Sequence, residues 1–146
     1  MRPFRYTLLT ALCAVLFMSH SSAADTTNRA LQVSPVPGLF VGGVGLLCVS
    51  GETPHRTEFF LLTRDREKLG SAIFDNDDVT YDMTPLVLKT PSAYRYEANS
   101  SYIEVDRKSL VVNAAGKTHN CELHSISNLH KAAERHLRVL LGENKI

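Results

Sequence analysis

The stretch LFVGGVGLLCVSGETPHRTEFFLLT, residues 39–63, decides the expected fold. It holds two apolar runs, Leu39–Ser50 and Thr57–Thr63, joined by a polar linker that contains Gly and Pro. Apolar runs of this length, bounded by polar and Gly/Pro clusters, are typical of β-strands. The chain is therefore expected to open its folded part with a pair of strands, the first of which carries Cys48.

The same pattern recurs at intervals of about ten residues as far as Leu123. Six further strands are predicted at Ala72–Phe74, Leu86–Lys89, Ala93–Ala98, Tyr102–Asp106, Leu110–Asn113 and Thr118–Leu123. The segments between them hold Asn, Asp, Ser and Gly, which tolerate tight turns. Short antiparallel strands at this interval predict a small, mainly β domain, either a barrel or a sandwich.

The end of the chain changes to a helical period. Apolar or partly apolar side chains recur at spacings of three and four, at Leu129, Ala132, Ala133, His136, Leu137, Leu140 and Leu141. Ser127 and Asn128 are candidate caps, and Gly142 stands where a helix usually stops. We predict a C-terminal α-helix over 127–141 that packs on the β-domain, with an exposed partner-binding stripe as the alternative.

The N-terminus has the features of a secretory signal peptide over residues 1–23. Arg2 and Arg5 precede the 12-residue apolar run Thr7–Met18, and Ser21 and Ala23 have the spacing that a signal peptidase reads. The run is short for a retained membrane anchor, which is the alternative. We expect an extended leader over 24–38, a single domain over 39–146, no stable membrane anchor, and a periplasmic or secreted location.

Removal of the signal peptide changes the charge and the cysteine count. The remaining chain has 14 basic and 15 acidic side chains, so it carries no electrostatic footprint for nucleic acid. It keeps two of the three cysteines, Cys48 and Cys121. An even pair in an exported chain normally oxidises, so we predict that these two form a disulfide.

Signatures of catalysis and of cofactor binding are missing from the sequence. It has no Gly-rich phosphate loop, no G-x-S-x-G and no H-E-x-x-H, so the prediction is a protein that is not an enzyme and needs no cofactor. Possible metal ligands are His119, Cys121, His124, His130 and His136. Since the disulfide claims Cys121 and the last two histidines lie on different helix faces, no metal site is expected, and a metal-dependent protein stays an alternative.

Two polar loops have alternative interpretations. Asp75–Asp78 offers oxygen ligands for calcium but lacks the Gly and the later Glu of an EF-hand loop, so a solvated turn is expected. Asn99-Ser100-Ser101 is an acceptor for N-glycosylation in a eukaryotic source and a hairpin turn in a bacterial one.

One motif between the two cysteines points to a function. The segment 90–96, TPSAYRY, resembles the S-x-S-G-x-R-Y signature of the periplasmic and membrane-bound inhibitors of c-type lysozyme. In that family a small disulfide-closed antiparallel β-barrel presents a loop whose serine, with a lysine from a neighbouring segment, hydrogen-bonds the catalytic carboxylates of lysozyme. Ser92 matches that serine, and Arg95 and Tyr96 are in step. Ala93 replaces the family's Gly, and the W-x-K-G pattern that follows in the family is missing.

The resemblance implies a partner-binding surface made of Ser92, Arg95, Tyr96 and a basic side chain from Arg107 or Lys108. It implies an exported inhibitor or immunity protein against a lysozyme-like cell-wall hydrolase. Two other interpretations stay open. The segment 92–96 can be a strand whose tyrosines pack in the core, and the protein can be a structural or adhesion module of the cell envelope.

Overall fold

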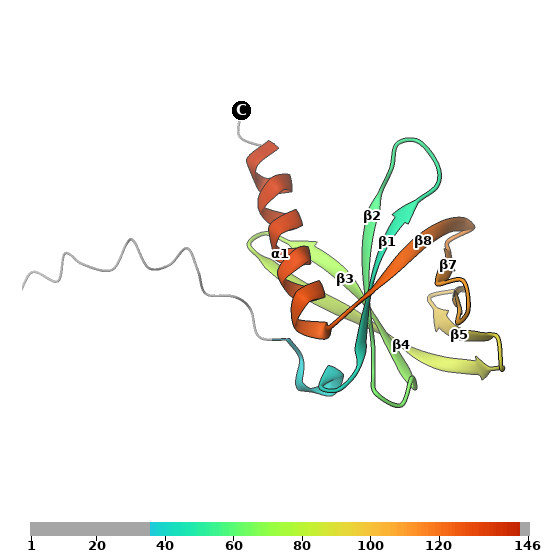
Figure 1. Cartoon of the computed structure of the whole chain (residues 1–146). Helices are drawn as coiled ribbons and strands as arrows, with labels where there is room; N and C mark the ends of the chain where they lie inside the picture. The colour runs from blue at the N-terminus through green and yellow to red at the C-terminus, as the bar shows by residue number, and fades with distance from the viewer. Residues whose placement is uncertain (1–35, 144–146) are drawn as a thin grey trace, which may run out of the picture. The chain divides into compact units, whose positions relative to one another are not determined.

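The computed structural model describes residues 36–143, which form an antiparallel β-barrel of eight strands and one C-terminal helix (Figure 1). The elements are a 3-10 helix η2 (Gly38–Phe40), the strands β1 (Val44–Ser50), β2 (Thr57–Leu62), β3 (Lys68–Asp75), β4 (Asp78–Lys89), β5 (Ala93–Ala98), β6 (Ser101–Asp106), β7 (Val111–Ala114) and β8 (Lys117–His124), and the helix α1 (Ile126–Glu143). Each strand pairs with the next along the chain, and β8 returns to pair with β1. The predicted mainly β architecture is confirmed, as a closed barrel.

Short hairpin turns connect most of the strands, as the polar segments predicted. Asn99 and Ser100 join β5 to β6 with φ of 32° and 73°, and Ala115 and Gly116 join β7 to β8 with φ of 50° and 75°. Two successive left-handed residues form the hairpin turn whose twist matches that of the flanking strands. The Asp75–Asp78 segment is also a turn, because Asp75 and Asp78 pair across the hairpin of β3 and β4.

A disulfide closes the barrel where its first and last strands meet. Cys48 in β1 and Cys121 in β8 are directly opposite in the register, with their Cα atoms 4.0 Å apart, and they form the predicted bond. Cys48 is fully buried. The covalent link therefore lies at the seam, the junction of β1 and β8, where pairing of the first and last strands leaves the sheet without an open edge.

The barrel interior is a packed apolar core. Its buried members alternate along the strands, and they are Leu46, Cys48, Phe60, Leu62, Leu69, Tyr94, Tyr96, Ile103, Val105 and Val112. Tyr94 and Tyr96 thus point inward from β5, as the strand interpretation of this segment expected. The hydroxyl of Tyr96 donates to the carbonyl oxygen of Arg66 at 2.9 Å, and burial raises the pKa of Tyr96, which keeps it a neutral donor.

A second core lies outside the barrel wall, under α1, which packs against β1, β2 and β4 (Figure 1). Two glycines let this layer come close to the strands. A Cβ on Gly45 would lie 2.6 Å from the Cβ of Leu129, and a Cβ on Gly70 would lie 2.6 Å from the ring of Phe40. Leu129 and Phe40 are both fully buried. The helix is therefore the expected cover for one face of the sheet: Leu129, Ala133 and Leu137 are buried, whereas Leu141 at the end of the predicted stripe is exposed.

The structure corrects several predicted boundaries. The helix begins at Ile126, because Ser125 caps it by accepting the N–H of Asn128 at 3.3 Å, and it runs through Gly142, so Ser127, Asn128 and Gly142 do not bound it. The first strand begins at Val44 and not at Leu39. The five residues between hold η2 and a turn in which Gly42 has a φ of 76°.

The strands β3 and β4 are longer than the sequence predicted. Their paired part runs from Lys68 and Pro85 to the turn at Asp75 and Asp78. Most apolar side chains of this paired part face α1. Exposed charged and hydroxyl side chains stand between them in β4. The apolar runs in the sequence are therefore interrupted, which made the predicted strands too short. The predicted signal peptide, residues 1–23, and nearly all of the predicted leader lie outside the described residues.

Replacing Cys48 and Cys121 together by alanine is expected to lower the free energy of unfolding by about 4 kcal/mol, since the 73-residue separation no longer restricts the unfolded chain. Urea unfolding of the variant and of the oxidised parent measures this difference. The reduced parent is the matched control and should lose a similar amount. A double variant as stable as the oxidised parent contradicts the prediction.

Replacing Gly45 by alanine is expected to lower the free energy of unfolding by roughly 1–3 kcal/mol, because the new Cβ meets Leu129. Gly51 has no atom within 4 Å of the position that a Cβ would take, so Gly51→Ala is the control and should change it by less than about 0.5 kcal/mol. In a double-mutant cycle, Gly45→Ala should lower the free energy of unfolding by less when Leu129 is also replaced by alanine. Equal costs in both backgrounds would show that the contact does not matter.

Candidate functional site

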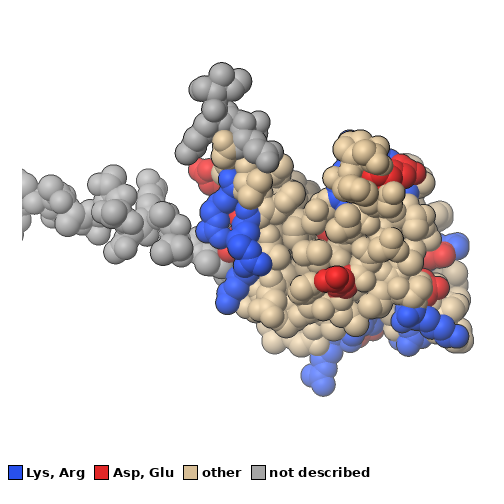
Figure 2. Space-filling model, turned by 45° about the horizontal axis from the view of Figure 1, so that its top comes forward, with Lys and Arg blue, Asp and Glu red and all other residues tan. Residues whose placement is uncertain are grey.

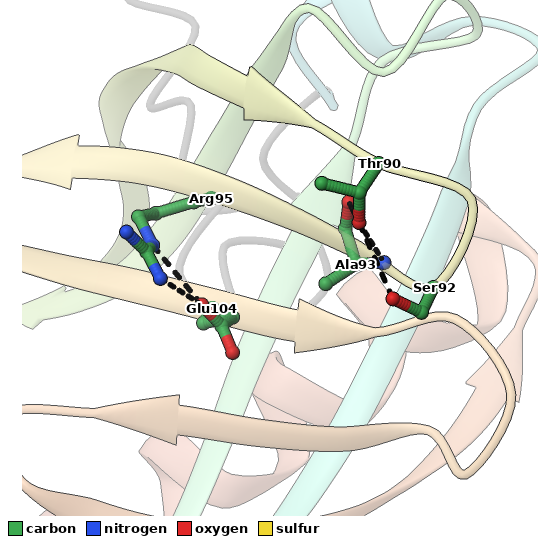
Figure 3. Close-up of polar contacts among 5 residues, drawn as sticks. All are labelled: Thr90, Ser92, Ala93, Arg95 and Glu104. Atoms are coloured by element: carbon green, nitrogen blue, oxygen red, sulfur yellow. Dashed lines mark hydrogen bonds and ion pairs between the residues drawn. The ribbon is translucent and has the colours of Figure 1, made fainter.

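The candidate site lies at one end of the barrel, where the β4–β5 turn meets the segment between β6 and β7. Thr90 builds the first of these. Its hydroxyl accepts the N–H of Ala93 at 2.9 Å and lies 3.3 Å from the hydroxyl of Ser92 (Figure 3). A backbone bond from the Thr90 N–H to the Ala93 carbonyl, 2.9 Å, closes the turn. The turn thus holds the exposed Ser92 hydroxyl on a hydrogen-bonded backbone.

Arg107 ties the two loops together. Its backbone N–H donates to the carbonyl of Ser92 at 2.8 Å, and its guanidinium Nη1 donates to the carbonyls of Thr90 and Pro91 at 3.1 Å each. The guanidinium carbon also lies 4.8 Å from the ring centroid of Tyr94, a cation–π distance. The cation is therefore fixed beside Ser92 from three directions.

Lys108 follows Arg107 in a turn that Asp106 organises. The Asp106 carboxylate accepts the backbone N–H of Ser109 at 2.7 Å and that of Lys108 at 2.9 Å. These bonds to its ionised form hold the pKa of Asp106 below its usual value, the Ser109 N–H having the larger effect. Ser92, Arg107 and Lys108 are all exposed. The hydrogen bonds of Arg107 place its guanidinium beside the turn that carries Ser92, and Lys108 is the next residue along the same segment.

The other two predicted site residues lie elsewhere. Arg95 is on the outer wall of the barrel, where its guanidinium forms an ion pair with Glu104 at 2.7 Å; Figure 3 shows this pair farther along the strands than Ser92. Tyr96 is fully buried in the interior and offers no surface to a partner. Its part is to fix Arg66 through the hydrogen bond to the Arg66 carbonyl.

Sequence reasoning missed Thr90 and Arg66. Thr90 shapes the turn that presents Ser92, and a threonine before a Pro-Ser pair is a local signal of a side-chain-capped turn that could have found it. Arg66 reaches the same end of the barrel from the β2–β3 loop. Nothing local in its sequence shows this, because the placement depends on the long-range bond from Tyr96.

The histidines serve different local contacts. His119 is buried inside the barrel with Nε2 3.4 Å from Oε1 of Glu58. His130 is buried on the inner face of α1, with Nδ1 2.8 Å from the Tyr81 hydroxyl. His136 packs on the rings of β2 and β3 at 5.3–5.5 Å. Within residues 36–143 no three side chains of His, Cys, Asp or Glu come together as metal ligands.

Basic side chains also gather on the outer side of α1, which Figure 2 shows as a blue stripe. The exposed Lys131, Arg135 and Arg138 have the spacing of one helix face. In the described part of the chain no helix is long and apolar enough to cross a membrane.

The titration of Asp106 is expected to be visible at the turn that it caps. Since its folded pKa lies below the unfolded value of 3.8, its stabilising effect is complete well above that value and is lost as the pH falls through the folded pKa. The Ser109 amide proton shift, followed by NMR from neutral to acid pH, should step below pH 3.8. Asp106→Asn keeps the acceptor oxygen without the titration, so its curve should lack the step. A step above that pH in the parent contradicts the capping role.

Comparison with known proteins gives no further guide to the family: the chain matches no family model, and neither curated proteins nor solved structures give a significant match.

Proposed function

We propose that the protein is an exported, non-enzymatic inhibitor or immunity protein that binds a lysozyme-like cell-wall hydrolase. The observation that carries the proposal is the exposed Ser92 hydroxyl on the turn to which the Arg107 guanidinium is hydrogen-bonded, with the exposed Lys108 next to Arg107 in the chain. The resemblance of segment 90–96 to inhibitors of c-type lysozyme supports the same target class. In this proposal Ser92 has the role of the family's serine, and Arg107 has the role of the family's lysine.

The chemistry of the target explains why this surface suits it. Glycoside hydrolases of this kind place two carboxyl groups on either side of the bond that they cleave. A hydroxyl donates to one carboxylate, and a guanidinium offers parallel N–H donors to the other. Arg107 uses Nη1 for the carbonyls of its own loop, and no described residue accepts from its Nη2 or Nε. These nitrogens are the donors that we assign to the partner.

The rigidity of the loops favours binding. The hydrogen bonds of Thr90 and Arg107 hold the turn before any partner arrives. Because the side chains are already ordered, less conformational entropy is lost on association. A loop held in this way blocks a cleft without being cleaved or modified.

The predicted signal peptide and the disulfide support a location outside the cytosol. Disulfides persist outside the cytosol, where cell-wall hydrolases act. A periplasmic or secreted inhibitor would meet its target there.

The proposal is tested by mixing the purified, oxidised protein with a panel of muramidases and following the lysis of cell walls. We expect at least one enzyme to be inhibited. For that enzyme, Ser92→Ala and Arg107→Gln should each raise the inhibition constant about tenfold, the effect of losing a hydrogen bond to a charged group. Ser92→Asp should weaken inhibition further, because it sets a carboxylate against the carboxylates of the enzyme.

Two variants control for charge and for position. Arg135→Gln removes a cation from the far side of α1 and should leave inhibition unchanged. Arg95→Gln maps the extent of the surface and should have a smaller effect than Arg107→Gln, since Arg95 is paired with Glu104 on the wall. Unchanged lysis by every enzyme in the panel would reject the proposed function.

A further inference from the structure

A cavity that shares Arg107 with the candidate site opens beside these loops, into the barrel itself. It measures about 200 Å³. Its apolar lining consists of Val44, Leu46, Leu62, Val105, Leu110 and, at the rim, Leu123. Leu123 is 56% exposed at the open rim of the cavity. The cavity therefore exposes apolar surface that the fold leaves uncovered.

Polar groups in the lining are cationic or neutral. Arg66 and Arg107 line the cavity together with Tyr94, and none of the described Asp or Glu side chains does. Each guanidinium is held by backbone carbonyls through Nη1, that of Arg66 by Thr63 at 2.7 Å. In residues 36–143 no hydrogen bond uses the Nη2 or Nε of either arginine. Two arginines whose Nη2 and Nε have no acceptor among the described residues thus line an apolar space.

Three acids neighbour these arginines in the sequence: Glu67, which forms no ion pair with either arginine in the described structure, and Asp65 and Asp106, which are engaged in turns. Asp65 accepts the hydroxyl of Thr63 and the N–H of Glu67, and both bonds hold its pKa below the usual value. Asp106 caps its own turn in the same way. Neither carboxylate forms an ion pair with Arg66 or Arg107 in the described structure. The positive end of the cavity is therefore left for an external anion.

We propose that this cavity binds a small organic anion with an apolar tail, a carboxylate of about six to eight carbons. The tail fits the leucine and valine lining, and the carboxylate lies between the two guanidinium groups. The cavity measures about 200 Å³ and is open on one side, so it admits a short tail, and the chain length at which the affinity stops rising measures its depth. The inference goes beyond the proposed function and does not depend on it.

The first experiment titrates the whole oxidised protein with butanoate, hexanoate, octanoate and decanoate, followed by amide NMR shifts. The affinity should rise about fourfold per added methylene and level off near eight carbons, when the cavity is full. Shifts should concentrate at Leu46, Arg66 and Leu123. Hexan-1-ol should bind more weakly than hexanoate, and hexan-1-amine should not bind, because the cavity end is cationic.

The second experiment changes the charge at the exposed rim, where folding is least affected. Leu123→Lys should strengthen hexanoate binding, and Leu123→Asp should weaken it, each by about fivefold. Arg66→Gln should weaken hexanoate about fivefold and leave hexan-1-ol unchanged. Arg95→Gln, on the outer wall, is the matched control and should have no effect.

The outcomes separate this site from the proposed function. Affinity that does not depend on chain length, equal binding of the amine, or the same affinity in Leu123→Lys and Leu123→Asp would each overturn the inference. Arg107 is common to both proposals, so inhibition of a muramidase is separated from this site by a different assay and through Ser92, which does not line the cavity. If the protein inhibits a muramidase but binds no carboxylate, only the proposed carboxylate site is contradicted. If it binds carboxylates but inhibits no muramidase, only the proposed inhibitor function is contradicted.

Discussion

The structure depends on the pairing of β1 with β8. An up-and-down sheet of eight strands has two edges, each with a row of unpaired backbone groups, until its first and last strands meet. Six residue pairs make that junction, and the disulfide between Cys48 and Cys121 lies among them. Every other feature follows from this closure, because only a closed sheet has an interior for Tyr96 and an end at which separate loops converge.

The outer layer depends on the same junction. Gly45 belongs to β1 and admits Leu129 of α1, which follows β8 after only Ser125. The helix therefore packs across the seam onto strands that lie far from it in the chain. Two cores, one inside the wall and one under the helix, share the strands between them, so these strands bury both of their faces.

Much of this architecture could be predicted from the sequence, and the site only in part. Alternating apolar residues located eight strands, and the two cysteines left after the predicted signal peptide indicated the disulfide, because both signals are local or combinatorial. The predicted helix caps Ser127 and Asn128 were wrong, although the actual cap, Ser125, is a local contact. The predicted length of β4 was incomplete, since its inner face packs on α1 through long-range contacts such as Tyr81 with His130, 49 residues apart. Ser92 and Arg107 lie close together because β5 pairs with β6, a pairing that the spacing of the predicted strands suggested. The buried position of Tyr96, by contrast, shows that a residue that matches a motif is not necessarily exposed.

The pairing of the first and last strands also has a kinetic consequence. Hairpins such as β5–β6 and β7–β8 join residues close in sequence and need little chain ordering before they form. The seam brings together residues 73 positions apart, and contacts of high sequence separation slow folding. Closure of the barrel is therefore expected to be the slow step in folding. Until it occurs, β1 and β8 are unpaired edge strands with which other copies of the chain can pair. Oxidation of the cysteines traps the closed form and removes that hazard.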